Sequence, residues 1–377
     1  MNFDQFSDRR PSGSMKWNKF TEDVTPLWVA DMDFQSPDCV QKALQKCVDH
    51  NIYGYSLPKK ELIGTIIDML KNKYNWEIKP SAIVWLPGLV PALNIAARGC
   101  VQNNREVLTH TPVYPPFLTA PILSNRKLKT NELSIENKRY EIDFDLMDSS
   151  CSEKTELYYL CNPQNPTGRA FERDELEKIA EVCLKNEMFI CSDEIHCDLI
   201  LEDKKHIPIA SISPEIAENT ITLMAPSKTY NVPGLGFSFA IIQNYKLRKR
   251  FLRAMNGIVP YPGQIGLAAG LAAYRDGEEW RLQLLEYLKE NRNTVKKFLN
   301  QHLPDVSYIP GEATYLAWLD MRKLKLEDPF RYFLKHKVAL SNGAEFNGEG
   351  FLRLNFGCAN STLIEGLEKM KAAYESI

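Results

Sequence analysis

The chain has 377 residues, and its 46 Lys and Arg against 48 Asp and Glu give a formal net charge of −2. This balance gives no electrostatic reason to expect nucleic acid or an anionic membrane surface as a partner. Hydrophobic residues make up 44% and charged residues 25%, as in an ordinary globular protein, and the length predicts two domains or one domain with an additional lobe.

The sequence also predicts a cytoplasmic protein. No apolar run approaches the roughly 20 residues that cross a bilayer, and the start "MNFDQFSDRRPSGSMKW" lacks the apolar core of a secretory signal. The nine cysteines are odd in number and include no Cys-x-x-Cys pair, so we expect reduced thiols. The histidines show no ligand spacing, and therefore we expect no metal site.

Short β-type runs alternate with helical patterns through most of the chain. The segment up to about residue 48 has no strand partner in this pattern and is expected to pack with the C-terminal part. A helical pattern spans 172–186. The β-type runs lie at 82–86, 106–110, 156–161, 188–193, 220–225 and 237–242. Near-continuous apolar strands separated by helices predict an α/β fold with a mainly parallel central sheet covered on both faces.

The pattern changes near residue 280. A long helix is expected over 278–303, where it could bridge two domains. A strand within 314–321, a helix near 328–337, a strand within 350–357 and a closing helix from about 361 follow. We therefore expect a large domain over 49–280 and a smaller α+β domain formed by 1–48 and 281–377.

Chemically informative residues follow several of these strands, where ligands bind in open α/β sheets. Gly88 precedes a helix that could hold a phosphate at its N-terminus, although Pro-Gly is also an ordinary turn. The loop "NPQNPTG" (162–168) carries two asparagines. Asp193 ends an apolar strand, where its carboxylate needs a cationic or N–H partner, and extended backbone is expected after it. Lys228 follows the run at 220–225, inside "APSKTYNVPGLG".

Other common site types are not supported. The chain has no Gly-x-Ser-x-Gly elbow, no phosphate loop of the Gly-x-x-x-x-Gly-Lys type and no Gly-x-Gly-x-x-Gly after an early strand. Pyridoxal 5'-phosphate (PLP) requires a lysine for a Schiff base, an acid beside the pyridine nitrogen, a donor to the phenolate oxygen and a phosphate cradle. The strand-end residues offer this set.

The order of motifs adds a resemblance. "NPQNPTG", "SDEIH", "SKTYNVPGLG" and "FLRLNFG" resemble the fold-type I PLP enzymes of the aminotransferase class I/II group. "PLWVADMDF", "YGYS", "TPVYPPF" and "SDEIHCDL" look like the MalY/PatB-type cystathionine β-lyases. The resemblance runs from about residue 25 to the end, and it implies the aspartate-aminotransferase-like fold with PLP as cofactor.

This resemblance implies a role for each matching residue. Lys228 would carry the cofactor and act as general base at the substrate Cα, Asp193 would pair with the pyridine N–H, and Arg353 would clamp the substrate carboxylate. The further binding residues that it implies are Asn165 at the ring oxygen and the substrate, Tyr114 on the ring, Gly88, Leu89 and Ser227 at the phosphate, and His196.

Tyr55 would reach the phosphate and substrate of a neighbouring subunit, which implies a homodimer with shared active sites. Tyr55 and Tyr114 could instead be ordinary packed aromatics. Arg353 is harder to explain in that way, because an arginine inside the apolar run "FLRLNF" has no acidic residue near it in sequence.

Two departures narrow the implied activity. His196 stands where aminotransferases usually carry a tyrosine, and Gly236 stands where they commonly carry an arginine that contacts phosphate. The resemblance therefore implies a carbon–sulfur β-lyase that converts L-cystathionine or a related cysteine S-conjugate to pyruvate, ammonia and a thiol. An aminotransferase of the same fold, and a lyase with an additional regulatory protein-binding role, remain alternatives.

Overall fold

Seven strands form the central sheet of the structure, a computed structural model that describes residues 2–377. Their order is β2-β10-β9-β8-β7-β3-β4. The strands are β2 (Ile83–Leu86), β3 (Glu106–Thr111), β4 (Lys127–Glu132), β7 (Thr155–Cys161), β8 (Phe189–Asp193), β9 (Thr220–Met224) and β10 (Ser238–Ile241). Strand β10 runs antiparallel to both neighbours and the other pairs are parallel. The mainly parallel sheet and its six predicted strands are confirmed, whereas β4 was not predicted.

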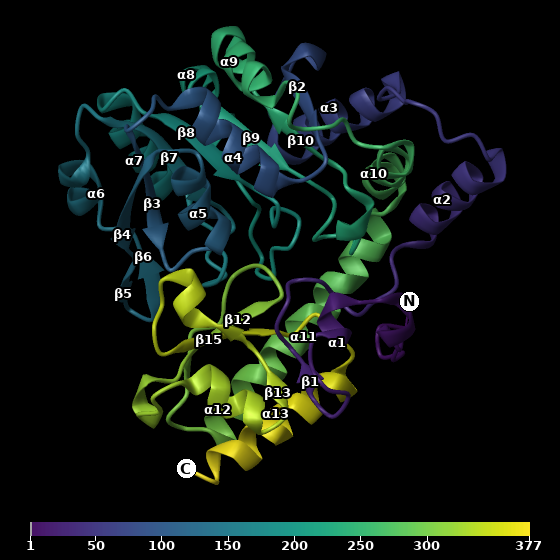
Figure 1. Cartoon of the computed structure of the whole chain (residues 1–377), viewed down its shortest axis with the longest axis vertical. Helices are drawn as coiled ribbons and strands as arrows, with labels where there is room; N and C mark the ends of the chain where they lie inside the picture. The colour runs from purple at the N-terminus through teal and green to yellow at the C-terminus, as the bar shows by residue number, and fades with distance from the viewer. Residues whose placement is uncertain (1) are drawn as a thin grey trace.

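Helices cover both faces of this sheet (Figure 1). In β7, Leu157 and Tyr159 pack into the core beneath one set of helices, while Tyr158 and Leu160 pack toward the other set. This period of two explains why the strand is apolar throughout. The first set is α4 (Leu89–Cys100), α5 (Pro115–Leu123) and α9 (Tyr245–Met255), and the second includes α6 (Phe144–Ser150) and α7 (Arg173–Lys185).

Three further helices pack together on the side of the molecule where β2 and β10 lie (Figure 1). They are α2 (Asp38–His50), α3 (Lys60–Tyr74) and α10 (Gln264–Asp276), and α10 packs against both of the others. The chain between α2 and α3 is an exposed, extended connection at 51–59. The remaining short elements are α8 (Pro214–Glu218), which precedes β9, and the paired strands β5 (Ser134–Glu136) and β6 (Arg139–Glu141), which lie near β4 at the opposite edge of the sheet (Figure 1).

A second, antiparallel sheet lies below the first in Figure 1. Its strands, in order, are β11 (Ser307–Tyr308), β12 (Leu316–Asp320), β15 (Phe351–Asn355) and β14 (Ser341–Asn342). The helices beside it are α11 (Glu278–His302), α12 (Pro329–Lys335) and α13 (Asn360–Tyr374). The predicted α+β composition of this part is confirmed, and α11 runs from one sheet toward the other as expected.

The first part of the N-terminal segment packs with this C-terminal part. Strand β1 (Thr25–Pro26) pairs in parallel with β13 (Val338–Ala339). The helix α1 (Met15–Asn18) lies close by in Figure 1. Helix α2, in contrast, packs against α10. The division into domains of 49–280 and of 1–48 with 281–377 stays a prediction.

The sheet topology collects the loops that follow its parallel strands. Strand β2 is antiparallel to β10, which is antiparallel to β9, so β2 points the same way as β9, β8, β7 and β3. The carboxyl ends of these five strands therefore share one edge. The extended backbone predicted after Asp193 is wrong, because residues 195–198 form a turn in which the Asp193 Oδ1 accepts a 3.1 Å hydrogen bond from Ile195 N–H.

Within residues 2–377, no helix combines the length and the apolar character that crossing a membrane requires.

Candidate active site

A cavity of about 240 Å³ lies at this carboxyl edge, where the loops meet β15 of the second sheet. Every predicted site residue except Tyr55 lines it. Those residues are Gly88, Leu89, Tyr114, Asn165, Asp193, His196, Ser227, Lys228 and Arg353. They come from six separate stretches of the chain: the parallel strand order brings five of these together, and β15 of the second sheet adds Arg353.

Lys228 lies in a turn just after β9 and is partly buried. Its Nζ donates a 2.6 Å hydrogen bond to the backbone carbonyl of Ala30. Burial lowers the pKa of Lys228 to about 8, with the charge of Arg353 acting in the same direction and the carboxylates of Asp31 and Asp193 opposing it. With this pKa about a tenth of the amine is neutral at pH 7, far more than for an exposed lysine, and a nucleophile or a base reacts in the neutral form.

Asp193 ends β8 with its carboxylate buried. Burial raises its pKa to about 7, and the charge of Glu194 adds to this, while the Ile195 N–H and Lys228 act the other way. The Ile195 N–H is the hydrogen bond that the carboxylate receives from the chain. A ligand carrying a cationic N–H would complete the site and stabilise the ionised carboxylate.

Arg353 lies on β15 and is buried, with 4% of its surface exposed. Its guanidinium donates to Asn165 Oδ1 at 2.9 Å and to Ser341 Oγ at 3.1 Å, and it lies 4.7 Å from the centre of the Phe346 ring. Burial lowers its pKa to about 10. Among residues 2–377 it forms no ion pair, so an anionic ligand is the natural partner for this charge.

The N-terminus of α4 opens into the same cavity. Gly88 is its N-cap and no side chain caps the helix there, so the backbone N–H groups of the first turn face an anion-binding position. Ser227 lines the cavity beside them. Gly236, at the position where the sequence lacks an arginine, has a left-handed backbone with φ of 62°, a conformation that favours glycine.

His196 and Tyr114 complete the walls. Burial lowers the pKa of His196 to about 3, with Lys228 and Arg353 contributing, so its imidazole is neutral. Its ring meets that of Tyr315 edge to face with 6.1 Å between centroids. Tyr114 caps α5, and its backbone N–H donates to the Asn165 carbonyl at 3.0 Å.

Tyr55 is the exception among the predicted residues. It is fully exposed on the connection between α2 and α3 and does not line the cavity. Neighbouring Ile52, Tyr53 and Leu57 are exposed as well. A contact between Tyr55 and this kind of site therefore requires a second copy of the chain.

The comparisons with known proteins agree with this arrangement. The family described as Aminotransferase class I and II matches residues 22–370. The chain belongs to this family. Cystathionine β-lyase PatB of Bacillus subtilis strain 168 is 37% identical over 386 residues, which cover 99% of this chain and 100% of PatB.

Solved structures match over the whole length. The crystal structure of OvoB superposes with a TM-score of 0.97 at 40% identity and covers 100% of both chains. Cystalysin from Treponema denticola, whose crystal structure contains pyridoxal 5'-phosphate, gives a TM-score of 0.96 at 32% identity over 100% of this chain and 99% of cystalysin.

The site of this family member also includes residues that the sequence did not reveal. The N-terminal segment contributes Val29 and the Ala30 carbonyl, and Ile195 and Phe237 add apolar wall. A backbone carbonyl has no signature in the sequence, so only the fold could reveal the contact with Lys228. Within residues 2–377, no group of three or more His, Cys, Asp or Glu side chains is arranged to hold a metal.

Proposed function

We propose that this protein is a PLP-dependent carbon–sulfur β-lyase that cleaves L-cystathionine or a related cysteine S-conjugate to pyruvate, ammonia and a thiol. The observation that carries the proposal is the single cavity that the Lys228 amine, the Asp193 carboxylate and the Arg353 guanidinium share. The likeness to a protein named cystathionine β-lyase supports the substrate class, and the likeness to PLP-containing cystalysin supports the cofactor.

The residues present fit this cofactor. Within residues 2–377 the Asp193 carboxylate forms no ion pair, and it would receive the N–H of the pyridine ring. The open N-terminus of α4, led by Gly88 and Leu89, and the Ser227 hydroxyl would hold the phosphate. Tyr114 would lie against the ring and the Asn165 side chain would donate to the ring oxygen.

Bound PLP supplies an electron sink that makes the proton on the substrate Cα acidic. The Lys228 amine, whose pKa burial lowers to about 8, takes that proton in its neutral form. The Cβ–S bond then breaks and the thiolate leaves. Arg353 binds the substrate α-carboxylate with its fixed pair of N–H donors, and Asn165 holds the guanidinium in place.

Two residues favour elimination over transamination. The neutral His196 occupies the place of the usual aminotransferase tyrosine, and Gly236 occupies the place of the phosphate-binding arginine. Because both reactions begin with loss of the same Cα proton, the decision depends on where the next proton goes. An aminotransferase of the same fold is therefore the competing function.

A substrate panel separates the two. The purified protein is given L-cystathionine without any keto acid and pyruvate is measured. We expect steady release of pyruvate, and a visible cofactor band that borohydride removes. Turnover that begins only when a keto acid is added would identify an aminotransferase and contradict the lyase proposal.

We further propose a homodimer in which Tyr55 of each chain completes the neighbouring site at the phosphate and the substrate. The support is an exposed apolar strip on the connection between α2 and α3, with Ile52, Tyr53 and Leu57 beside Tyr55. Sedimentation of the native protein should give twice the mass of one chain. Tyr55→Ala should bind PLP more weakly, and a monomeric native protein would exclude the shared site.

Two broader features complete the proposal. We propose a cytoplasmic location, which the nine unpaired cysteines favour. We also keep the assignment of 49–280 as the PLP-binding domain and of 1–48 with 281–377 as the small domain. Limited proteolysis that cuts first near residues 49 and 280 would support these boundaries.

A further inference from the structure

The segment 27–34 brings two backbone carbonyls to the site. The Ala30 carbonyl accepts hydrogen bonds from Lys228 Nζ at 2.6 Å and from the Tyr315 hydroxyl at 3.0 Å. The Trp28 carbonyl accepts one from Arg353 Nη2 at 3.2 Å. One short stretch of backbone thus contacts both the lysine and the arginine of the cavity, and its position affects both.

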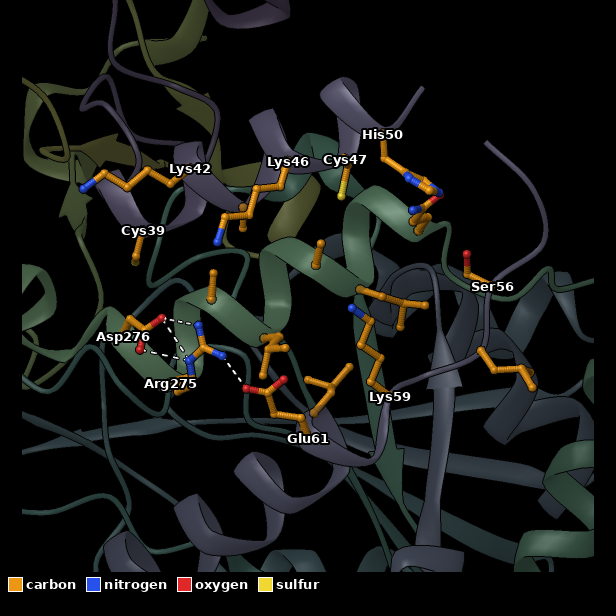
Figure 2. A pocket seen from close by; sticks show the side chains of 18 residues that line it. Cys39, Lys42, Lys46, Cys47, His50, Ser56, Lys59, Glu61, Arg275 and Asp276 are labelled. Carbon is orange, nitrogen blue, oxygen red and sulfur yellow. Dashed lines mark hydrogen bonds and ion pairs between the residues drawn. The ribbon is translucent and has the colours of Figure 1, made fainter. Parts of the chain in front are cut away.

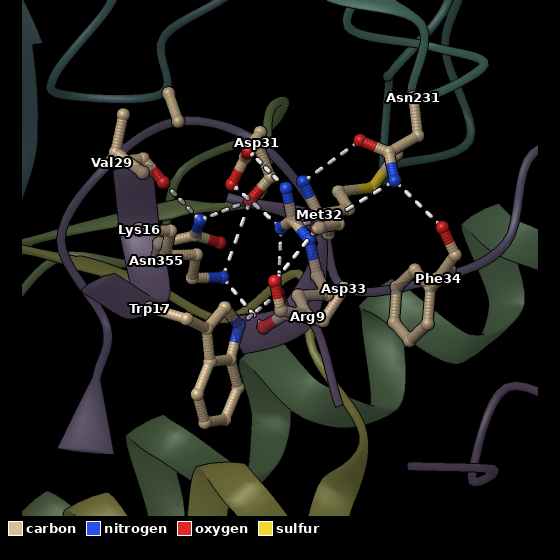
Figure 3. A network of polar contacts seen from close by, with 12 residues as sticks. Arg9, Lys16, Trp17, Val29, Asp31, Met32, Asp33, Phe34, Asn231 and Asn355 are labelled. Atoms are coloured by element: carbon tan, nitrogen blue, oxygen red, sulfur yellow. Dashed lines mark hydrogen bonds and ion pairs between the residues drawn. The ribbon is translucent and has the colours of Figure 1, made fainter. Parts of the chain in front are cut away.

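This segment contains no helix or strand, and a group of charged side chains holds it (Figure 3). Arg9 donates to Asp31 at 2.7 and 3.1 Å, to Asp33 at 2.8 Å and to the Met32 carbonyl at 3.1 Å. The buried Lys16 pairs with Asp33 at 2.7 Å. The positive charges come from the first 16 residues and the negative charges from the segment itself.

Two asparagines fix the segment from the other sides. The Asn355 amide donates to the carbonyls of Val29 at 2.6 Å and Asp31 at 2.7 Å. Asn231, three residues after Lys228, accepts from Met32 N–H at 3.0 Å and donates to the Met32 carbonyl at 2.9 Å. The segment is therefore tied to the small sheet and to the lysine loop, and Arg9 and Lys16 tie it to the N-terminal residues.

The two carboxylates in this group differ in their partners. Asp33 is shared by Arg9, Lys16 and the Trp17 indole N–H at 2.9 Å. Asp31 has Arg9 as its one cationic side-chain partner among residues 2–377. Without Arg9, the charge of Asp31 would have no compensating cation, while Asp33 would keep Lys16.

Asp31 acts on Lys228 through its charge, which favours the protonated amine. Asp31 also directly follows Ala30, whose carbonyl accepts the hydrogen bond from Lys228. The titratable and charged groups that face Lys228 are Asp31 on the N-terminal segment, Asp193 and His196 at the end of β8, Tyr114 before α5, and Arg353 on β15.

We propose that Arg9 is a positioning residue of the active site: it holds the Ala30 carbonyl against the Lys228 amine and offsets the charge of Asp31 beside that amine. The inference rests on the proposed role of Lys228 as the base. It assigns a function to the first residues of the chain, which contribute no side chain to the cavity.

The test uses two substitutions that act in opposite directions. Arg9→Gln removes the compensating cation and leaves Asp31 charged, so Lys228 should hold its proton more tightly. Asp31→Asn removes the negative charge, so Lys228 should lose its proton more readily. Arg10→Gln is the matched control, because Arg10 is the adjacent arginine but pairs with the exposed Asp8 at 3.4 Å.

The measurement is the pH dependence of Lys228 acylation in the full-length protein freed of PLP, quantified by mass spectrometry. We expect the midpoint to rise by about half a pH unit in Arg9→Gln and to fall by about the same amount in Asp31→Asn. Arg10→Gln should leave it unchanged. In Asp31→Asn, a second substitution of Arg9 should add little, because the charge that Arg9 offsets is gone.

A shift of the same sign in both variants, or no shift in either, would overturn the proposal, since general loosening of the segment cannot produce opposite signs. Arg9→Lys keeps the charge but not the forked geometry, so its midpoint for Lys228 acylation should lie close to that of the native protein. If Arg9→Gln fails to fold, Asp31→Asn and Arg9→Lys still decide the question. The acylation midpoint does not depend on turnover, so failure of the lyase proposal shows separately, as absent pyruvate.

The acid limb of kcat provides a second readout, because kcat reports ionisations in the enzyme–substrate complex, where the Lys228 amine acts as the base. It should move to higher pH in Arg9→Gln and to lower pH in Asp31→Asn, with Arg10→Gln matching the native protein. An acid limb that stays in place in both variants would contradict the role assigned to Arg9.

Discussion

Two hollows in the structure differ in size and in how their charges are paired. The larger, of about 830 Å³, is an open cleft between α2, α3 and α10 (Figure 2). The smaller, of about 240 Å³, lies at the carboxyl edge of the central sheet. Size alone would direct attention to the cleft, where drug-sized ligands would have room.

The charges in the two hollows show why size misleads. In the cleft, Arg275 forms ion pairs with Glu61 and with Asp276, the latter at 2.7 Å, and the side chains of Lys42 and Lys46 are exposed. In the cavity, Arg353 is buried without a carboxylate. The cleft charges are already compensated by protein or water, whereas the cavity charge is not.

This contrast supports the cavity as the proposed place for the chemistry. A buried cation without a protein anion and a buried acid without a protein cation are both costly to keep. The substrate carboxylate would compensate the buried cation, and the N–H of the cofactor would compensate the buried acid. Perturbed pKa values, such as those of Lys228 and Asp193, accompany such sites because burial and function act on the same groups.

The strongest test of the contrast is Lys228→Ala. We expect turnover of cystathionine to fall by about 10³-fold or more, because the base at the substrate Cα is lost. The fold should survive, since the side chain makes one hydrogen bond, to the Ala30 carbonyl. Pyruvate release measures the first effect and circular dichroism the second. Activity close to that of the native protein would refute the assignment.

Arg353→Lys should have the next largest effect. Lysine keeps the charge but loses the forked pair of donors, so kcat/KM should fall about 10²-fold, mainly through KM. Arg169→Lys is the matched control, because Arg169 is equally buried but is paired with Glu175 and Glu312. The Arg169→Lys variant should lose stability but keep the KM of the native protein. An unchanged KM in Arg353→Lys would contradict the carboxylate clamp.

Much of this site could be predicted from the sequence because it follows a topological rule. Asn165, Asp193 and Lys228 each come within a few residues of the end of an apolar run, and parallel strands place such positions at one edge. Arg353 was recognisable as a charge in an apolar strand. No contact had to be known for these predictions.

The features that the sequence did not predict depend on contacts between residues that are far apart in the sequence. Strand β4 (Lys127–Glu132) lies at the sheet edge and reads "KLKTNE", so it has no apolar run to reveal it. The pairing of Arg9 with Asp31 and Asp33 spans more than 20 residues, and no sequence spacing reveals it. The turn after Asp193 depends on the Ile195 N–H bonding back to its carboxylate.

A smaller difference between the cavity and the cleft is expected in the way the free energy of unfolding depends on pH. Burial lowers the pKa of His196 to about 3, so below its usual value of about 6.5 the unfolded chain takes up a proton that the folded chain refuses. Stability present above pH 6.5 is then lost as the pH falls, by about 2 kcal/mol between pH 7 and pH 5.

Urea unfolding of the protein without PLP at these two pH values, compared with the same measurement on His196→Asn, isolates this contribution, because the raised pKa of Asp193 adds an opposite change that both proteins share. His196→Asn should remove it, while His50→Asn, at an exposed histidine of the cleft, should leave it in place. His110, buried on β3 with its pKa lowered by burial to about 4, keeps its own contribution in both variants. An equal acid response in both variants would exclude His196 as the cause.

The smallest expected effect belongs to the cleft itself. Lys42→Ala and Lys46→Ala remove exposed charges that water and salt already screen. We expect kcat/KM for cystathionine to stay within about twofold of the native value, since neither lysine reaches the cavity. Steady-state kinetics and sedimentation together provide the measurement. A tenfold loss of kcat/KM in a variant that assembles normally would mean that the cleft takes part in catalysis. The proposed separation between an open, compensated surface and a small, uncompensated site would then fail.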